Sequence, residues 1–218
     1  SLDGAVMREP WVSVVPGSVE IAVDGHVLES AAPVYLMLNK PPGVVTTAHD
    51  PMGRRTVVDL IELPHRVFPI GRLDFDTEGL LLLTNDGELA YRLMHPSFKV
   101  PKTYHARVAG IPSRHQMEAL SRGPVLEDGP TQPVEAMLVK SMGKEAIIEI
   151  ILTEGKKRQV RRMCKAVGHP VLGLARVKYG ELSLGRLTIG RWRRLNPSEV
   201  DSLRRVVGLD AGPQHGRT

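Results

Sequence analysis

The segment that most constrains the fold is residues 71–87, where three carboxylates lead directly into four consecutive leucines. The leucines, at 80–83, lack the polar alternation of a half-exposed strand, and the Asn-Asp-Gly run at 85–87 is typical of a turn. We therefore predict a strand that is buried on both faces. A carboxylate desolvated in the loop before it stays ionised only beside a fixed cation. The carboxylates are those of Asp74, Asp76 and Glu78.

Three interpretations of this acidic loop compete. It is a solvated loop before a core strand, which is the usual position of charged residues, or a calcium loop, or the site of a catalytic carboxylate. Calcium is rejected because the last position of an EF-hand loop falls on Asn85, where a bidentate glutamate is needed, and leucines occupy the intervening ligand positions. The choice between the other two depends on partners elsewhere in the chain.

Charge and length narrow the class of protein. The 218 residues are 42% hydrophobic, enough for one large domain or two small ones, and the net charge of +5 with a pI near 9.5 favours a polyanionic partner. We find no apolar run long enough to span a membrane and no signal segment. The single cysteine, Cys164, is expected in the core and agrees with a reducing, cytoplasmic location. No histidine pair has metal-ligand spacing, so we expect no metal site.

A basic segment at residues 155–165 is the second informative stretch. Helical spacing places its cations on one face and its apolar residues on the other. The cations are Arg158, Arg161, Arg162 and Lys165, and the apolar set is Val160, Met163, Cys164 and Val167. Such a face is usually just solvated, but four like charges repel one another, and a docked polyanion would relieve that repulsion.

The remaining pattern predicts an α+β fold with a mixed, largely antiparallel sheet and flanking helices. We predict a strand at 35–38 before a stiff Asn-Lys-Pro-Pro-Gly turn, a helix capped at 85–86, a strand at 103–108, a helix with a capping box from Ser113 to Gln116, a hairpin of 134–139 with 146–152, and a last helix from Asn196.

The motifs resemble those of RNA pseudouridine synthases, within the RsuA-type group that modifies ribosomal RNA. The resemblance rests on GRLDFDTEGLLLLTNDGELA, on Lys102-Thr103-Tyr104 and on GKKRQVRRM, in the family's order. It implies the pseudouridine synthase fold with a central basic cleft and a catalytic role for Asp74. It also implies that Arg161 pairs with that aspartate and that Tyr104 stacks on the target base.

The resemblance also implies domains, contacts and partners. Residues 1–32 resemble the end of a small RNA-binding module, 33–207 form the catalytic domain, and 208–218 are a loose tail. The chain is expected to act as a monomer without a cofactor on ribosomal RNA, with a weak preference for the large subunit over the small one. A non-catalytic RNA-binding or assembly factor is the alternative. Candidate RNA contacts are Lys40, Arg72, Lys102, Lys156, Lys157, Arg158, Arg162 and Lys165.

Overall fold

The computed structural model describes residues 1–8, 11–12, 14, 19–28 and 31–209, which fall into two compact units, Ser1–Pro33 and Val34–Thr218. In the first unit, β1 (Ala22–Val23) pairs with β2 (His26–Val27). The sequence also predicts two short β-like patches in this unit, at residues 11–15 and 19–23. The second patch is a strand only at its end, and the first lies partly outside the described residues.

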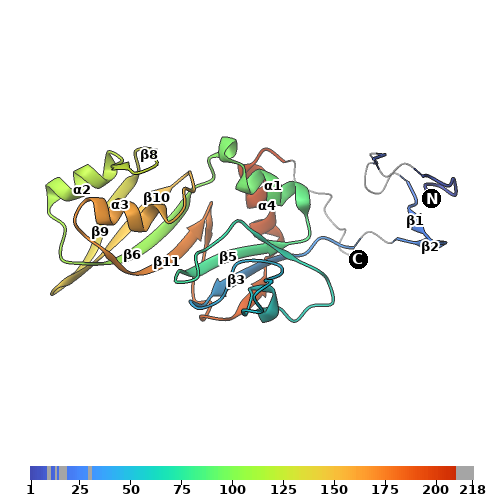
Figure 1. Ribbon diagram of the computed structural model, residues 1–218, viewed down its shortest axis with the longest axis horizontal. Helices are drawn as coiled ribbons and strands as arrows, with labels where there is room; N and C mark the ends of the chain where they lie inside the picture. The colour runs from blue at the N-terminus through green and yellow to red at the C-terminus, as the bar shows by residue number, and fades with distance from the viewer. Residues whose placement is uncertain (9–10, 13, 15–18, 29–30, 210–218) are drawn as a thin grey trace. The chain divides into compact units, whose positions relative to one another are not determined.

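The second unit is built on one long mixed sheet (Figure 1). Along its main path the strand order is β13-β3-β5-β11-β6-β10-β9, with β4 paired to β5 and β12 paired to β11. The strands are β3 (Tyr35–Lys40), β4 (Phe68–Ile70), β5 (Glu78–Thr84), β6 (Lys102–Ala109), β9 (Glu135–Met142), β10 (Glu145–Leu152), β11 (Val171–Tyr179), β12 (Leu182–Ser183) and β13 (Trp192–Arg194). Its strand pairs are antiparallel except for β5 with β11. The predicted fold class is confirmed.

Helices cover the sheet in two groups. In Figure 1, α2 (Arg114–Ser121) and α3 (Gln159–Ala166) lie over β6, β9 and β10, whereas α1 (Gly87–Met94) and α4 (Pro197–Val206) lie together near β5. Short elements complete the unit: η1 (Val58–Leu60), η2 (Pro96–Phe98) and the hairpin of β7 (Val125–Leu126) with β8 (Gly129–Pro130). The predicted caps are confirmed: Asp86 accepts from the N–H of Leu89, and a capping box forms at Ser113. Asn196 starts α4 as predicted, and it also forms a capping box, which was not predicted.

The leucine run forms β5 as predicted, and its alternate side chains enter two different cores. Leu80 and Leu82 pack with α1 and α4, whereas Leu81 and Leu83 pack on the other face with residues of β3 and the loops after it. A third core lies between β6, β10, α2 and α3. A strand buried on both faces explains the absence of polar alternation.

Gly79 allows the backbones of the parallel strands β5 and β11 to approach closely. A Cβ at this position would lie 2.3 Å from the carbonyl oxygen of Arg176 on β11, and the backbone φ is +107°. Only glycine allows this approach. The acidic loop before β5 is thereby held against the other half of the sheet.

The C-terminal end of the unit differs from the prediction at residues 208 and 209. The loose tail was predicted from residue 208, but Leu209 packs against the α1/α4 core and the Gly208 carbonyl accepts from Arg92. Residues 210–218 lie outside the described residues. No helix in the described part of the chain is long and apolar enough to cross a membrane.

Candidate active site

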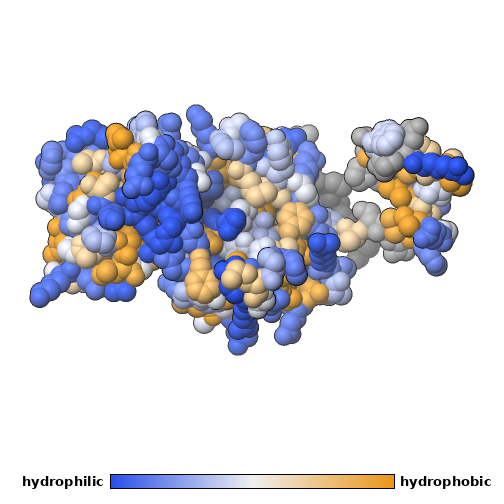
Figure 2. Space-filling model, viewed as in Figure 1, coloured by the Kyte–Doolittle hydropathy of each residue, from blue (hydrophilic) through white to orange (hydrophobic). Residues whose placement is uncertain are grey.

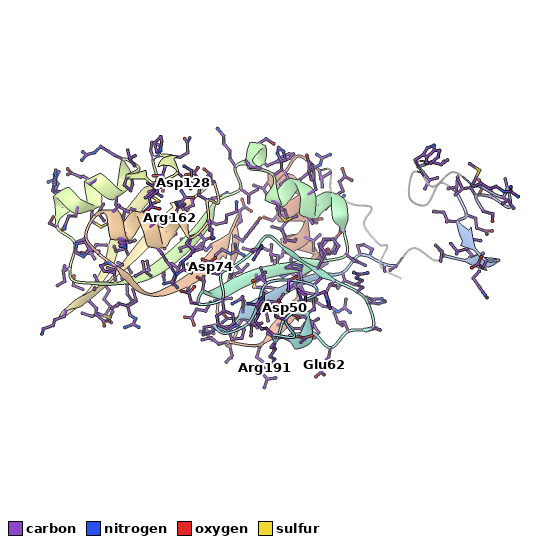
Figure 3. All side chains as sticks on the ribbon, viewed as in Figure 1. Asp50, Glu62, Asp74, Asp128, Arg162 and Arg191 are labelled. Carbon is purple, nitrogen blue, oxygen red and sulfur yellow. The ribbon has the colours of Figure 1, made fainter. Side chains whose placement is uncertain are left out.

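A cleft of about 580 Å³ lies where the loop before β5, strands β6 and β11, and the segment leading into α3 meet. Asp74 and Tyr104, far apart in sequence, both border it. Its apolar walls are Leu73, Leu152, Val160 and Leu174, and its cationic rim is Arg72, Lys156, Lys157 and Arg158. Figure 2 shows a continuous hydrophilic area over the part of this face where Figure 3 labels Asp74, Asp128 and Arg162.

The backbone of residues 73–77, here named the Asp74 loop, is held by hydrogen bonds from outside it. Each of its five carbonyl groups accepts a donor from another segment. The Leu73 oxygen accepts from Thr46 Oγ1 at 2.7 Å, that of Asp74 from Lys40 Nζ at 3.2 Å, that of Phe75 from Gly43 N at 2.8 Å, that of Asp76 from Arg161 Nη2 at 2.9 Å, and that of Thr77 from Lys40 Nζ at 2.9 Å. A loop fixed in this way presents its side chains in one geometry before substrate binds.

Lys40 is an internal support and not an RNA contact, which corrects the prediction. It is fully buried, and its ammonium donates to Pro41, Asp74 and Thr77 carbonyl oxygens. Burial lowers its pKa from 10.5 to about 8, and the nearby carboxylates, Asp74 first, oppose that shift. In sequence, Lys40 before the stiff Pro-Pro turn is also compatible with a solvated turn lysine, but the fold buries its side chain completely.

The predicted pair of Arg161 with Asp74 is wrong, because Arg161 contacts Asp76. Its Nη2 lies 3.2 Å from Asp76 Oδ2, and Arg158 binds the same carboxylate through two bonds of 2.8 and 2.9 Å. Hydrogen bonds from Arg158, followed by the charge of Arg161, lower the pKa of Asp76. Asp76, to which the sequence assigned no role, thus joins the Asp74 loop to the start of α3.

Asp74 faces the cleft with a partly exposed side chain, 38% accessible. Among the described residues its ion pair is with Arg158, whose Nη1 lies 3.7 Å from Asp74 Oδ2. The predicted desolvation of this acid is therefore only partial. Arg158 has a positive φ of 51° and precedes α3, so it also leaves the helical face on which spacing placed it.

Tyr104 is half-buried between two cores and borders the cleft beside Asp74. Leu174 and Leu152 provide apolar surface in the same cleft. An aromatic ring with apolar neighbours is the surface on which an unstacked base is held in single-stranded RNA recognition. The predicted grouping of acid and tyrosine is therefore observed.

The other predicted RNA contacts are divided. Arg72 and Lys157 are exposed at the cleft, and Lys165 is exposed on α3 away from its lining. Lys156 borders the cleft but donates to the Pro130 oxygen, and Arg162 makes two bonds to Asp128 of the β7–β8 turn (Figure 3). Lys102 does not border the cleft: its Nζ lies over the Tyr179 ring, and burial lowers its pKa to about 8.

Sequence reasoning missed Asp76, Asp128 and the supporting role of Lys40. Each acts through a partner more than 30 positions away, so no local pattern marks it. The one available signal was the excess of acids beside the leucines, among which only Asp74 was expected to have a role. In the described part of the chain, no three metal-ligating side chains are grouped to hold an ion.

Comparison with known proteins gives the family of the chain. Residues 34–166 match the family described as RNA pseudouridylate synthase. The chain belongs to this family. The synthase is 47% identical over 94% of its length to ribosomal large subunit pseudouridine synthase B of Bacillus subtilis, of which it covers 85%. It is 42% identical over 99% of its length to an uncharacterized RNA pseudouridine synthase of Aquifex aeolicus, covering 88% of that protein.

A solved structure agrees over the same span. The synthase aligns with the crystal structure of a pseudouridylate synthase with a TM-score of 0.73 and 30% identity, over 93% of this chain and 87% of the other. The fold, with its mixed sheet and cleft, is therefore that of pseudouridine synthases.

Proposed function

We propose that this synthase isomerises a uridine of large-subunit ribosomal RNA to pseudouridine, with Asp74 as the catalytic carboxylate. The observation that carries the proposal is one cleft bordered by Asp74, Tyr104 and a cationic rim. The choice of ribosomal RNA of the large subunit is supported by the name of the Bacillus subtilis relative.

The reaction needs few protein groups. The bond from uracil N1 to the anomeric carbon breaks, the base turns, a bond forms from C5 to the same carbon, and the C5 proton is lost while N1 gains one. Asp74 either attacks the anomeric carbon or removes a proton from the sugar. Tyr104 and the leucines hold the detached base, and the exposed rim cations Arg72 and Lys157 bind the backbone phosphates.

A cation faces Asp74 in the cleft. Arg158 Nη1 lies 3.7 Å from the Asp74 carboxylate. The Asp76 carboxylate accepts from Nη1 and Nη2 of Arg158 and also lies 3.2 Å from Nη2 of Arg161. The Asp76 carboxylate therefore orients the guanidinium that faces Asp74. A pure RNA-binding protein has no use for an acid held in a phosphate-binding cleft.

The test is release of tritium from C5-labelled uridine in large-subunit transcripts. We expect Asp74→Asn to abolish release, a loss of at least about 10³-fold, with RNA affinity within a few-fold of the original protein. Small-subunit transcripts serve as the control substrate. Turnover retained by Asp74→Asn would remove Asp74 from the chemistry, and turnover confined to small-subunit transcripts would reassign the substrate.

A further inference from the structure

A second cavity adjoins the active-site cleft, and Arg72 borders both. Its volume of about 440 Å³ is within the range of about 300–1,000 Å³ found for ligand sites. The reaction at Asp74 makes no use of it. It is bounded by residues 45–51 and by Arg54, Pro69, Gly71, Arg72 and Met94.

One wall of this cavity is an arginine fixed in a single plane. Arg54 donates to Asp50 through Nε at 3.1 Å and Nη2 at 2.7 Å, and its backbone N–H donates to the same carboxylate at 2.9 Å. The Asp50 side chain is 4% exposed, whereas that of Arg54 is 50% exposed. The buried acid therefore holds the half-exposed guanidinium in one orientation at the cavity wall. Figure 3 labels Asp50 in this part of the molecule.

The pairing decides what kind of group the wall recognises. Hydrogen bonds from Arg54 lower the pKa of Asp50 to about 2, so the two charges cancel at neutral pH. Asp50 accepts from Nε and Nη2 of Arg54, and the flat face of the guanidinium can still stack on a nucleobase. Other walls of the same cavity are apolar: Pro51, Pro69 and the Met94 side chain, whose residue is 44% exposed.

We propose that this cavity is a second nucleotide site, in which an unpaired base neighbouring the target uridine stacks on the Arg54 guanidinium. The inference rests on the proposed function, because RNA held in the cleft at Asp74 must pass Arg72 to reach this cavity. The second site selects the sequence or the unpaired state beside the target, and the first site performs the chemistry.

The first experiment measures steady-state turnover and equilibrium binding of a stem-loop RNA that contains the target uridine. We expect Arg54→Ala to raise KM and Kd about 10-fold, as loss of one base stack does, with kcat within about twofold. Arg54→Lys gives a similar loss because an ammonium has no flat face. The matched control is Arg55→Ala, which removes an exposed neighbouring arginine outside the cavity. Thermal unfolding verifies that each variant is folded.

The second experiment identifies the base. Abasic nucleotides are placed in turn on each side of the target uridine. One position is expected to cost the original protein about 10-fold in Kd and to cost Arg54→Ala almost nothing, since the two changes remove the same contact.

Two results would overturn the second site. One is the absence of any abasic position that couples to Arg54. The other is a combination of two findings: Arg54→Lys leaves Kd unchanged, and Arg54→Ala lowers the slope of log K against log salt concentration by about the amount of one phosphate contact. That combination would mark Arg54 as a phosphate contact. Lack of turnover by the original protein would instead refute the proposed function, and the binding arms still test the second site.

Discussion

Replacing Lys40 with methionine tests how the active site is supported. Without the ammonium, the Pro41 and Thr77 carbonyls lose their donor, whereas the Asp74 carbonyl keeps that of the Thr77 N–H. Two orphaned carbonyls cost about 2–6 kcal/mol. The substitution also removes a buried charge, and the shift of the Lys40 pKa from 10.5 to about 8 sets that saving at about 3 kcal/mol. The free energy of unfolding should therefore change little, within a range from a gain of about 1 kcal/mol to a loss of about 3 kcal/mol.

We expect a large loss of turnover beside this small change in the free energy of unfolding. The Asp74 loop loses two of the bonds that fix its carbonyls, and a displacement of about 1 Å at a reacting group costs about 100-fold. Urea unfolding and tritium release on the same samples compare the two effects. Lys178→Met, at an exposed strand position, is the control. A variant with unchanged turnover, or one too unstable to fold, would refute the reasoning.

The pH dependence isolates the buried charge. Because burial lowers the pKa of Lys40 to about 8, the unfolded chain binds more protons than the folded chain between about pH 8 and 10.5. Stability contributed by this group therefore rises with pH through that window. The unfolding free energy of the original protein minus that of Lys40→Met should increase by up to about 3 kcal/mol from pH 7 to above pH 10.5. A difference that is flat with pH would contradict the assigned burial.

Two further substitutions test the junction of the sheet halves. Asp76→Asn removes the shared partner of Arg158 and Arg161. We expect kcat to fall about 10–100-fold while RNA binds as tightly or more tightly, as measured by turnover and by filter binding at several salt concentrations. Unchanged turnover would contradict an orienting role for Asp76. Gly79→Ala should cost about 3 kcal/mol or more in urea unfolding, because the new Cβ overlaps the Arg176 carbonyl. Gly87→Ala, with open space around its Cβ at the first turn of α1, is its control and should be neutral or slightly stabilising.

The elements of this fold could be predicted because their signals are local. Four such predictions depend on a few adjacent residues and are confirmed: the leucine strand, the cap at Asp86, the capping box at Ser113 and the helix start at Asn196. Strand order could not be predicted in this way. The parallel pairing of β5 with β11 joins residues almost a hundred positions apart through main-chain bonds that leave no pattern except Gly79.

The residues that border the candidate site were predicted more accurately than the contacts between them. Asp74, Tyr104 and the segment before α3 do border one cleft. The choice between Asp74 and Asp76 as the partner of Arg161 depends on the turn at 74–77, whose direction is set by distant donors such as Lys40. Helical spacing could not foresee the positive φ of Arg158, which moves that cation off the helix and onto the acids.

The parallel pair of β5 and β11 is short, with register contacts only at Glu78 and Gly79 of β5, yet the cleft opens beside it. Leu174 of β11 belongs to the core under α3, and Tyr179 of the same strand belongs to the core under α1 and α4. Side chains in either hydrophobic interior can therefore be exchanged during evolution without moving the reacting groups, provided that this narrow junction keeps its spacing. We expect the sequence to change most slowly at this junction of β5 and β11.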